Sequence, residues 1–217
     1  MSSQLAAKRY AKYWKLRVEV FGPEKAFQKF TQAEALKDDA VALSIGVFNV
    51  VGTKDSQGRG ILFMDPSKQD HDKYTRESML RTIWYKVHCA LEDEETQRHG
   101  LVFVACPKKV RMGQFDRGLS QRMIPAIQGC LPVRVSGFHI CHPPTFFAII
   151  FPLVKVFMNE RMKKRIQVHR GSDEKVLKAL EKYGLTKDCL PTLLGGGIVL
   201  DPPVWLEKRR EQESNVF

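Results

Sequence analysis

Residues 131–170, LPVRVSGFHICHPPTFFAIIFPLVKVFMNERMKKRIQVHR, decide the fold of this chain. Val133–Cys141 is rich in β-branched and aromatic residues and has the length of a buried strand. Two prolines follow it, and proline is tolerated in the first turn of a helix because its missing N–H would have no intrahelical partner there. We therefore expect a helix from Pro144 or Thr145 to Met158, and a basic segment directly after it.

The predicted helix is apolar on nearly every side, and Lys155 is its one charged residue. Such a helix is buried on both sides or faces an apolar environment. A membrane span would need about 20 predominantly apolar residues, whereas Pro152 cuts this run and charges follow it at once, so we reject a span. By the spacing of three and four residues, one face carries Phe147, Ile150, Phe151, Val154, Phe157 and Met158.

Pro152 removes the hydrogen bond to the carbonyl of Ala148 and favours a kink inside the helix. Two interpretations stay open. The helix is either an ordinary core helix or a movable lid over an apolar cavity, with Pro152 as its hinge.

The basic segment contains Arg161, Lys163, Lys164 and Arg165. If it is helical, Arg161, Lys164 and Arg165 share one face. A solvated surface is the usual position for such charges. Here they directly follow an apolar helix, which suits an anionic bilayer surface, where each Lys or Arg contributes about 1 kcal/mol.

These residues carry a resemblance to the CRAL-TRIO lipid-binding family, and within it to the branch of the α-tocopherol transfer protein and the cellular retinaldehyde-binding protein. The similar region covers about Val41–Leu200. The motifs that resemble the family, in this order, are DSQGRGILF from Asp55, the strand pattern Gly100–Pro107, LPVRVSGFH from Leu131, VKVFM from Val154, KRIQVHRG ending at Gly171, and LPTLLGGG from Leu190.

The resemblance implies a lipid-binding domain in which a sheet floors an apolar cavity and a mobile gate helix, here Pro144–Met158, covers it. Phe138 and Ile140 on the preceding strand then line the cavity together with the apolar face of the gate helix. The implied ligand is a hydrophobic lipid of the phospholipid, tocopherol, retinoid or sterol type. The implied function is to bind this lipid and exchange it at anionic membranes.

In the resembling branch, basic residues beside the gate bind phosphoinositide headgroups, and Arg134, Arg161 and Arg165 match three of these positions. Ser136 occupies a fourth, which weakens the cluster unless Lys163 and Lys164 compensate. Where the phosphatidylinositol-transfer branch has P-E-R, this chain has Pro132-Val133-Arg134, which disfavours an inositol lipid as the enclosed cargo. Val156 also replaces the proline that is usual in the gate.

The net charge of +11, from 35 Lys and Arg against 24 Asp and Glu, favours an anionic partner. We expect a membrane surface and no nucleic acid, because the basic residues lack the interleaved aromatics or glycines of common nucleic-acid modules. The five cysteines form no C-x-x-C pair and are expected to be reduced thiols of an intracellular protein. No secretory signal is expected, because Met1–Lys12 lacks an apolar core. The expected state is a cytoplasmic monomer that associates reversibly with membranes.

The rest of the chain alternates helix and strand patterns, which predicts an α/β fold with a mostly parallel sheet flanked by helices. We expect residues 1–40 to be a short helical segment, 41–200 the lipid-binding domain and 201–217 a charged, frayed tail. The family's longer N-terminal bundle is therefore expected to be mostly missing. The predicted helices are 5–20, 24–36, 74–91, 116–128 and 172–183, and the predicted β segments are 41–51, 61–64, 101–105 and one ending at Arg170.

No catalytic constellation is recognisable, since the sequence contains no G-x-S-x-G, H-E-x-x-H or phosphate-loop motif. We expect no enzyme activity and no cofactor. His139, Cys141 and His142 could ligate a metal, but His142 would point away from the other two on a strand, so we expect no metal site. A protein-interaction module that has lost its cargo stays open as an alternative.

Overall fold

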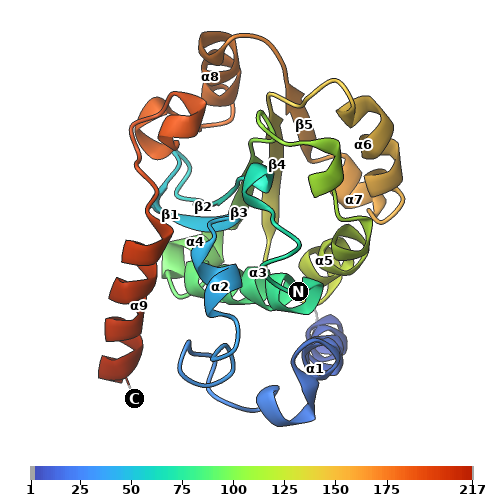
Figure 1. The fold of residues 1–217 in the computed structure, drawn as a ribbon, viewed down its shortest axis with the longest axis vertical. Coiled ribbons are helices and arrows are strands. Elements are labelled where there is room, and N and C mark those ends of the chain that lie inside the picture. The colour runs from blue at the N-terminus through green and yellow to red at the C-terminus, as the bar shows by residue number, and fades with distance from the viewer. Residues whose placement is uncertain (1–2, 217) are drawn as a thin grey trace.

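The computed structural model describes residues 3–216; Met1, Ser2 and Phe217, which the predicted terminal segments include, lie outside it. Its centre is a five-stranded sheet with the order β1-β2-β3-β4-β5 (Figure 1). β1 and β2 are antiparallel, and the other pairs are parallel, so the predicted mostly parallel sheet is confirmed. The strands are β1 Phe48–Lys54, β2 Gly60–Met64, β3 Leu101–Ala105, β4 Val135–Cys141 and β5 Ile166–His169.

Strand β3 is buried along its whole length, as expected for a central strand covered on both faces. Leu101 and Phe103 belong to the apolar cluster on one face, and Val102 and Val104 to the cluster on the other. Gly100 precedes the strand with φ 96°, and a Cβ there would lie 2.6 Å from the carbonyl oxygen of Arg134. Only glycine therefore lets β3 approach the start of β4 this closely.

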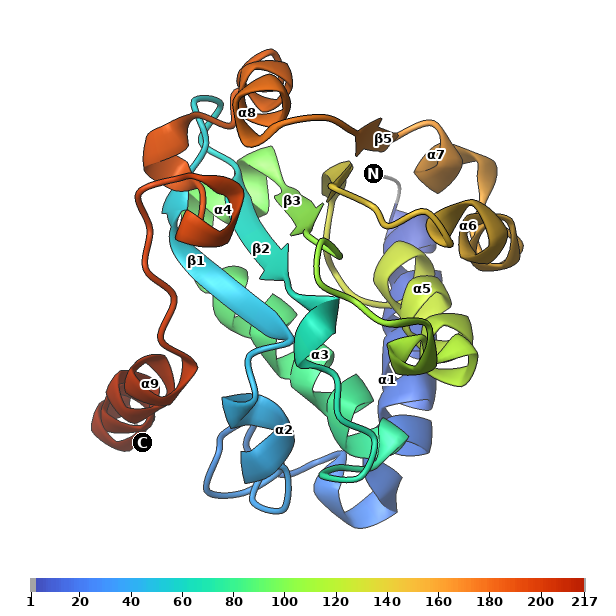
Figure 2. The ribbon, with the colours of Figure 1, turned by 45° about the horizontal axis from the view of Figure 1, so that its top comes forward.

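Helices cover both faces of the sheet (Figures 1 and 2). Helices α1, α2, α3 and α5 contribute to the larger apolar cluster, whereas α8, η3 and η4 pack on the opposite face. The helices are α1 Ser3–Lys25, α2 Ala40–Ser44, η1 Pro66–Lys68, α3 Arg76–Ala90, α4 Glu94–His99, η2 Met112–Gln114, α5 Arg117–Gly129, α6 Phe147–Lys155, α7 Glu160–Lys163, α8 Asp173–Glu181, η3 Lys187–Cys189, η4 Thr192–Leu194 and α9 Pro202–Val216.

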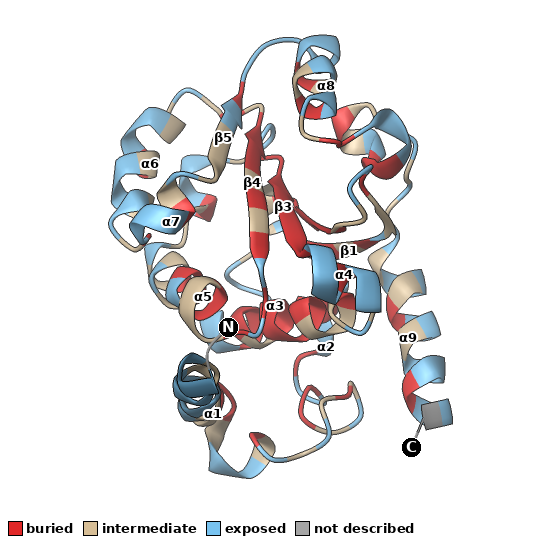
Figure 3. Cartoon of the chain, turned by 180° about the vertical axis from the view of Figure 1, so that it is seen from behind, coloured by how far each residue is buried: buried red, intermediate tan, exposed pale blue. Residues whose placement is uncertain are grey.

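Helix α3 is the most deeply buried helix of the described chain, as its coloring in Figure 3 indicates. Its predicted position is confirmed, and the Thr75 hydroxyl caps it by accepting the backbone N–H of Ser78. Trp84 and Tyr85 are fully buried on it. The predicted helices at 5–20, 116–128 and 172–183 are also present, and the first bends at Gly22 (φ 80°).

The prediction of a helix over 24–36 is wrong, because residues 26–38 form a series of turns. Phe27 and Phe30 have helical spacing, but they pack apart: Phe27 stacks on Trp14, and Phe30 lies against His88. The turns gain partners from remote segments, since the backbone N–H of Gln32 donates to Glu213 Oε2 at 2.9 Å. Tertiary contacts override the local helical pattern here.

Two further boundaries differ from the sequence-based expectation. Residues 40–44 form α2, and the first strand begins only at Phe48, since Gly46 adopts φ 81° between the two elements. The gate helix is also shorter than expected. It begins at Phe147, and Asn159 starts a separate helix, α7, by accepting the backbone N–H of Met162.

The expected frayed tail is instead helix α9, which lies along the edge of the molecule (Figure 1). Its few buried contacts explain why the sequence pattern did not reveal it. Leu206 and Glu213 are buried, and Glu213 accepts a hydrogen bond from the hydroxyl of Tyr85 at 2.5 Å. The Nζ of Lys86 lies 3.4 Å from the centre of the Trp205 ring.

Candidate functional site

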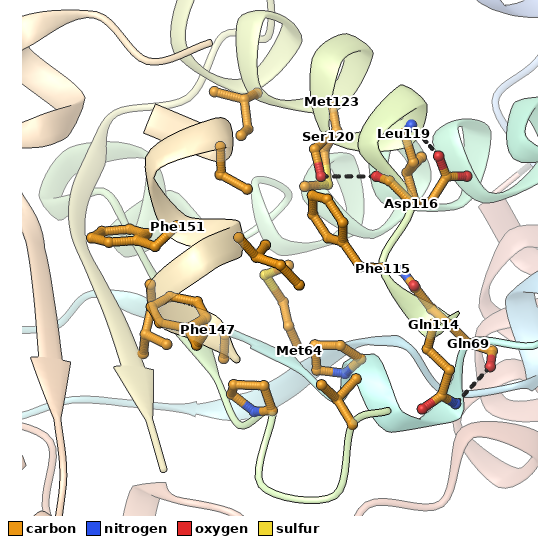
Figure 4. A pocket seen from close by; sticks show the side chains of 18 of the residues that line it. Met64, Gln69, Gln114, Phe115, Asp116, Leu119, Ser120, Met123, Phe147 and Phe151 are labelled. Atoms are coloured by element: carbon orange, nitrogen blue, oxygen red, sulfur yellow. Dashed lines mark hydrogen bonds between the residues drawn. The ribbon is translucent and has the colours of Figure 1, made fainter. Parts of the chain in front are cut away.

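An apolar cavity of about 170 Å³ lies between the sheet, α5 and α6 (Figure 4). Strand β4 contributes Phe138 and Ile140, and Met158, which follows α6, lines the cavity as well. Helix α6 contributes Phe147, Ile150, Phe151 and Val154. The structure therefore brings together all the side chains that the sequence assigned to the cavity except Phe157.

Phe157 does not line the cavity. Its carbonyl oxygen accepts a hydrogen bond from Nε2 of Gln128 at 2.8 Å, and its side chain packs on the larger apolar cluster. The cause is the early end of α6, because Phe157 no longer follows the helical face on which it was predicted.

Sequence reasoning missed the opposite wall of the cavity. Helix α5 supplies Leu119, Met123, Ile124 and Ile127, and the segment before it supplies Phe115. The signal was present, because α5 has an apolar face at helical spacing. That pattern does not distinguish a face turned to a cavity from one turned to a filled core.

Three polar side chains of the cavity wall, those of Gln114, Asp116 and Ser120, have partners within the protein. Nε2 of Gln114 donates to the carbonyls of Ser67 and Gln69, at 2.7 and 2.9 Å, and the hydroxyl of Ser120 donates to the carbonyl of Asp116 at 3.0 Å (Figure 4). The carboxylate of Asp116 accepts the backbone N–H of Leu119 and pairs with Arg76. A mostly apolar wall in which these three polar side chains already have partners favours an apolar occupant.

Helix α6 is apolar on both sides but buried on only one. Ile150 on the inner side is 7% exposed, whereas Ile149 and Val156 on the outer side are 66% and 76% exposed, and Leu153 is 41% exposed. Pro152 lies inside this helix and is itself exposed. An exposed apolar side next to basic residues is unusual for a surface helix.

A second hollow, of about 220 Å³, lies beside the cavity and is lined by four arginines, Arg9, Arg134, Arg161 and Arg165. We call it the arginine hollow. Ile127 and Met162 line both spaces. The predicted basic residues Arg134, Arg161 and Arg165 are thus brought together directly behind the cavity wall.

The arginine hollow is cationic, because no carboxylate of the described residues lines it. Burial lowers the pKa of the Arg165 guanidinium from its ordinary value, and the charges of Arg161 and Arg134 lower it further. Nη1 of Arg165 donates to the carbonyl of Val135, which fixes the side chain in place. Mutually repelling guanidinium groups held in one hollow favour a bound anion.

Arg9 is the site residue that the sequence did not suggest. It comes from α1, within the basic run that begins at Lys8. Ser136 does not line the arginine hollow, and its hydroxyl donates to the carbonyl of His99. Lys163 and Lys164 lie outside the arginine hollow. Lys163 pairs with Glu160 at 2.8 Å, and Lys164 is exposed.

His139 and His169 form a buried pair, with His139 Nδ1 and His169 Nε2 at 3.0 Å. The structure turns His142 to Asp173 instead, at 3.1 Å. Over residues 3–216 no three His, Cys, Asp or Glu side chains are grouped as metal ligands would be. In the same range no helix has the length and apolarity that crossing a membrane requires.

Comparison with known proteins agrees with this architecture. The family model described as "CRAL/TRIO domain" matches residues 45–196. The chain belongs to the CRAL/TRIO domain family. The matched range contains the sheet, the cavity and α6, whereas Arg9 of the arginine hollow lies before it.

The CRAL/TRIO relatives are distant. "Alpha-tocopherol transfer protein-like" of Homo sapiens is 29% identical over 175 residues, 79% of this chain and 49% of that protein. "Tyrosine-protein phosphatase non-receptor type 9" of Rattus norvegicus is 24% identical over 160 residues, 74% of this chain but 26% of the phosphatase. "Clavesin-1" of Xenopus laevis is 25% identical over 158 residues, 71% of this chain and 46% of that protein. The chain thus spans about half or less of the length of these curated relatives.

A solved structure with the same CRAL/TRIO fold is the one titled "Crystal structure of Sfh5". It superposes with a TM-score of 0.56 at 15% identity, over 90% of this chain and 73% of that one. At this identity the likeness concerns the fold alone.

Proposed function

We propose that the chain binds a hydrophobic lipid in the cavity under α6 and exchanges it at anionic membranes that contain phosphoinositides. The observation that carries this proposal is the apolar cavity beneath α6, in whose wall Gln114 and Ser120 are already hydrogen-bonded within the protein. Enclosing an apolar chain removes a cost of about 0.8 kcal/mol for each CH₂ that would otherwise meet water. The relative named for α-tocopherol transfer supports a carrier rather than an enzyme.

Ligand entry requires α6 to move. The cavity of about 170 Å³ is smaller than the roughly 300–1,000 Å³ of typical small-molecule sites, so a long lipid enters only when its wall moves outward. Helix α6 is the candidate gate, because one side lines the cavity and the other is exposed. Pro152 is its proposed hinge.

The membrane contact is proposed to combine two neighbouring features. The exposed side chains of Ile149, Leu153 and Val156 would enter the apolar part of the bilayer, and the arginine hollow would bind a phosphoinositide headgroup. Arginine suits this role because its guanidinium binds phosphate in a bidentate manner. The protein would then be a cytoplasmic monomer that associates with membranes reversibly.

Native mass spectrometry of the purified protein, followed by organic extraction and lipid identification, tests the proposal. We expect one lipid class in stoichiometric amount. Ile150→Trp should fill the cavity and abolish lipid recovery, whereas Ile149→Trp, one residue away on the outer side of α6, should leave it unchanged. A folded wild-type protein that is empty and takes up no lipid from mixed liposomes would refute the carrier function and favour a protein-interaction module.

A further inference from the structure

A basic cluster lies at the ends of strands β2 and β3, apart from the arginine hollow. Lys68, Lys109 and Arg111 line a hollow of about 470 Å³ together with Asp65, Ser67, Gln114 and Leu193. We call these three residues the strand-end cluster. In open α/β sheets, ligands bind outside the carboxyl ends of the strands, which is where both loops leave the sheet.

The two loops that carry the strand-end cluster also form one wall of the lipid cavity. Lys68 lies between Pro66 and Gln69, which both line the cavity. Lys109 and Arg111 flank Val110, which lines it as well. Each cation is therefore within two residues of an apolar or amide group that faces the cavity.

Gln114 holds this wall in place and lines both spaces. Its Nε2 donates to the carbonyls on either side of Lys68, those of Ser67 and Gln69, and its Oε1 accepts the backbone N–H of Arg111 at 2.9 Å. The amide thereby fixes the backbone beside two of the three cations at the edge of the apolar space.

The three cations of the strand-end cluster have no ion-pair partner within the described part of the chain, although Lys68 and Arg111 also line a neighbouring hollow with Asp70 and Asp72. All three side chains are exposed. The hollow contains one carboxylate, Asp65, whose Oδ1 accepts the backbone N–H and the hydroxyl of Ser67. The hollow therefore contains three cations and one carboxylate that already accepts hydrogen bonds, and this excess of positive charge suits an anion.

We propose that the cavity ligand is an anionic amphiphile whose apolar chain lies under α6 and whose carboxylate or phosphate head is bound by Lys68, Lys109 and Arg111. This inference rests on the proposed lipid-binding function and specifies the class of lipid. The head lies at the strand ends, so the membrane-facing arginine hollow stays free for a headgroup of the bilayer.

Fluorescence titration of the full chain with cis-parinaric acid, its primary alcohol and its phosphate monoester tests the proposal. The three probes share one apolar chain and differ only in the head. At low ionic strength and about pH 8, where the carboxylate is ionised, we expect the acid or the phosphate to bind about tenfold tighter than the alcohol. The anionic probe with the larger increase in affinity over the alcohol identifies the head as a carboxylate or a phosphate.

The variant Lys68→Gln/Lys109→Gln/Arg111→Gln should lose this preference and retain the affinity for the alcohol. The matched control Lys178→Gln/Lys182→Gln/Lys187→Gln removes the same charge from exposed positions on and after α8 and should retain the preference. Equal affinity of wild type for all three probes would overturn the anionic head while leaving the lipid site intact. Failure of every probe to bind, the alcohol included, would instead overturn the lipid site itself.

Discussion

Arg9 shows how one residue from a distant helix completes a site. It lies on α1, more than a hundred positions before Arg134, yet both line the arginine hollow. No spacing rule connects such positions, so the sequence predicted three arginines of this hollow and not the fourth. The family resemblance, rather than residue spacing, pointed to Arg134, Arg161 and Arg165 as one group, and one strand-helix-strand unit carries all three.

Arg9→Gln is predicted to weaken binding to phosphoinositide-containing vesicles about fivefold, since one cation near an anionic surface contributes about 1 kcal/mol. Vesicle co-sedimentation measures the affinity. Lys187→Gln, on η3 against the other face of the sheet, removes the same charge and should have no effect. Equal losses in the two variants would show that only total charge matters and that the arginine hollow has no special role.

Lys86 is a second residue whose environment the sequence did not reveal. It is 1% exposed on α3, and burial lowers its pKa from 10.5 to about 7. At a pH below this pKa, the buried ammonium group of Lys86 is charged. The Trp205 ring compensates part of the cost of burying this charge through a cation–π interaction, which contributes about 2 kcal/mol when desolvated. A predominantly apolar replacement of similar length should therefore stabilise the protein.

We predict that Lys86→Met raises the free energy of unfolding at neutral pH, and that this advantage shrinks by about 1–3 kcal/mol as the pH rises from about 7 to about 9. Between the pKa of Lys86 in the folded state and its ordinary pKa, the folded state binds fewer protons than the unfolded state. The free energy of unfolding of the wild type therefore increases with pH in this range. Urea denaturation of both proteins across this range measures the difference. A constant difference would mean that Lys86 titrates normally.

At the scale of elements, the sequence predicted those whose signals are local. Residues 101–105 form an uninterrupted apolar run, and Thr75 and Ser172 are N-cap residues directly before amphipathic helices. Sequence-based prediction failed where contacts with distant segments determine the local structure. The turns at 26–38 and helix α9 are joined by the hydrogen bond between Gln32 and Glu213, which are 181 positions apart. The first segment has a misleading helical pattern, and the second has no strong pattern of its own.

Helix α6 gives a test of the proposed hinge. Pro152→Ala restores the N–H that can donate to the carbonyl of Ala148, so it should straighten the helix and slow the transfer of a fluorescent lipid between vesicles several-fold. Pro125→Ala is the matched control, because Pro125 is likewise an exposed proline inside a helix, α5, that lines the same cavity. Unchanged transfer by Pro152→Ala, or equal slowing by both variants, would contradict a hinge at Pro152.

At the scale of the whole molecule, the cavity is assembled from strand ends, α5, α6 and the loops between them. The apolar pattern of α6 left both a core helix and a lid open, and the family resemblance implied the cavity beneath it. The identity of the cavity's ligand could not be predicted, because apolar contact is non-directional and the polar side chains of the wall come from separate segments, such as Gln69 in a loop, Gln114 in η2 and Ser120 on α5. The strand-end cluster belongs to those loops, and no regular pattern in the sequence groups its three residues.

The proposed membrane contact combines an apolar and an electrostatic part, and salt separates them. Screening shortens the range of exposed charges from about 30 Å at 0.01 M to about 3 Å at 1 M salt but leaves apolar insertion intact. Ile149→Ser/Val156→Ser removes the two most exposed apolar side chains on the outer side of α6 and of the residue that follows it, and should weaken vesicle binding about thirtyfold.

Vesicle binding measured over a range of salt concentrations should therefore separate the electrostatic part of the contact, which salt weakens, from the apolar part, which salt leaves intact. Binding by Ile149→Ser/Val156→Ser should disappear at high salt, because only charge holds it, whereas binding by Arg134→Gln/Arg161→Gln should be weak but nearly independent of salt. The vesicle affinity of the wild-type protein should decrease with salt until it equals that of the arginine variant, and then stay constant. If both variants showed the wild-type salt dependence, neither α6 nor the arginine hollow would face the membrane, and a different surface of this cationic protein would make the contact.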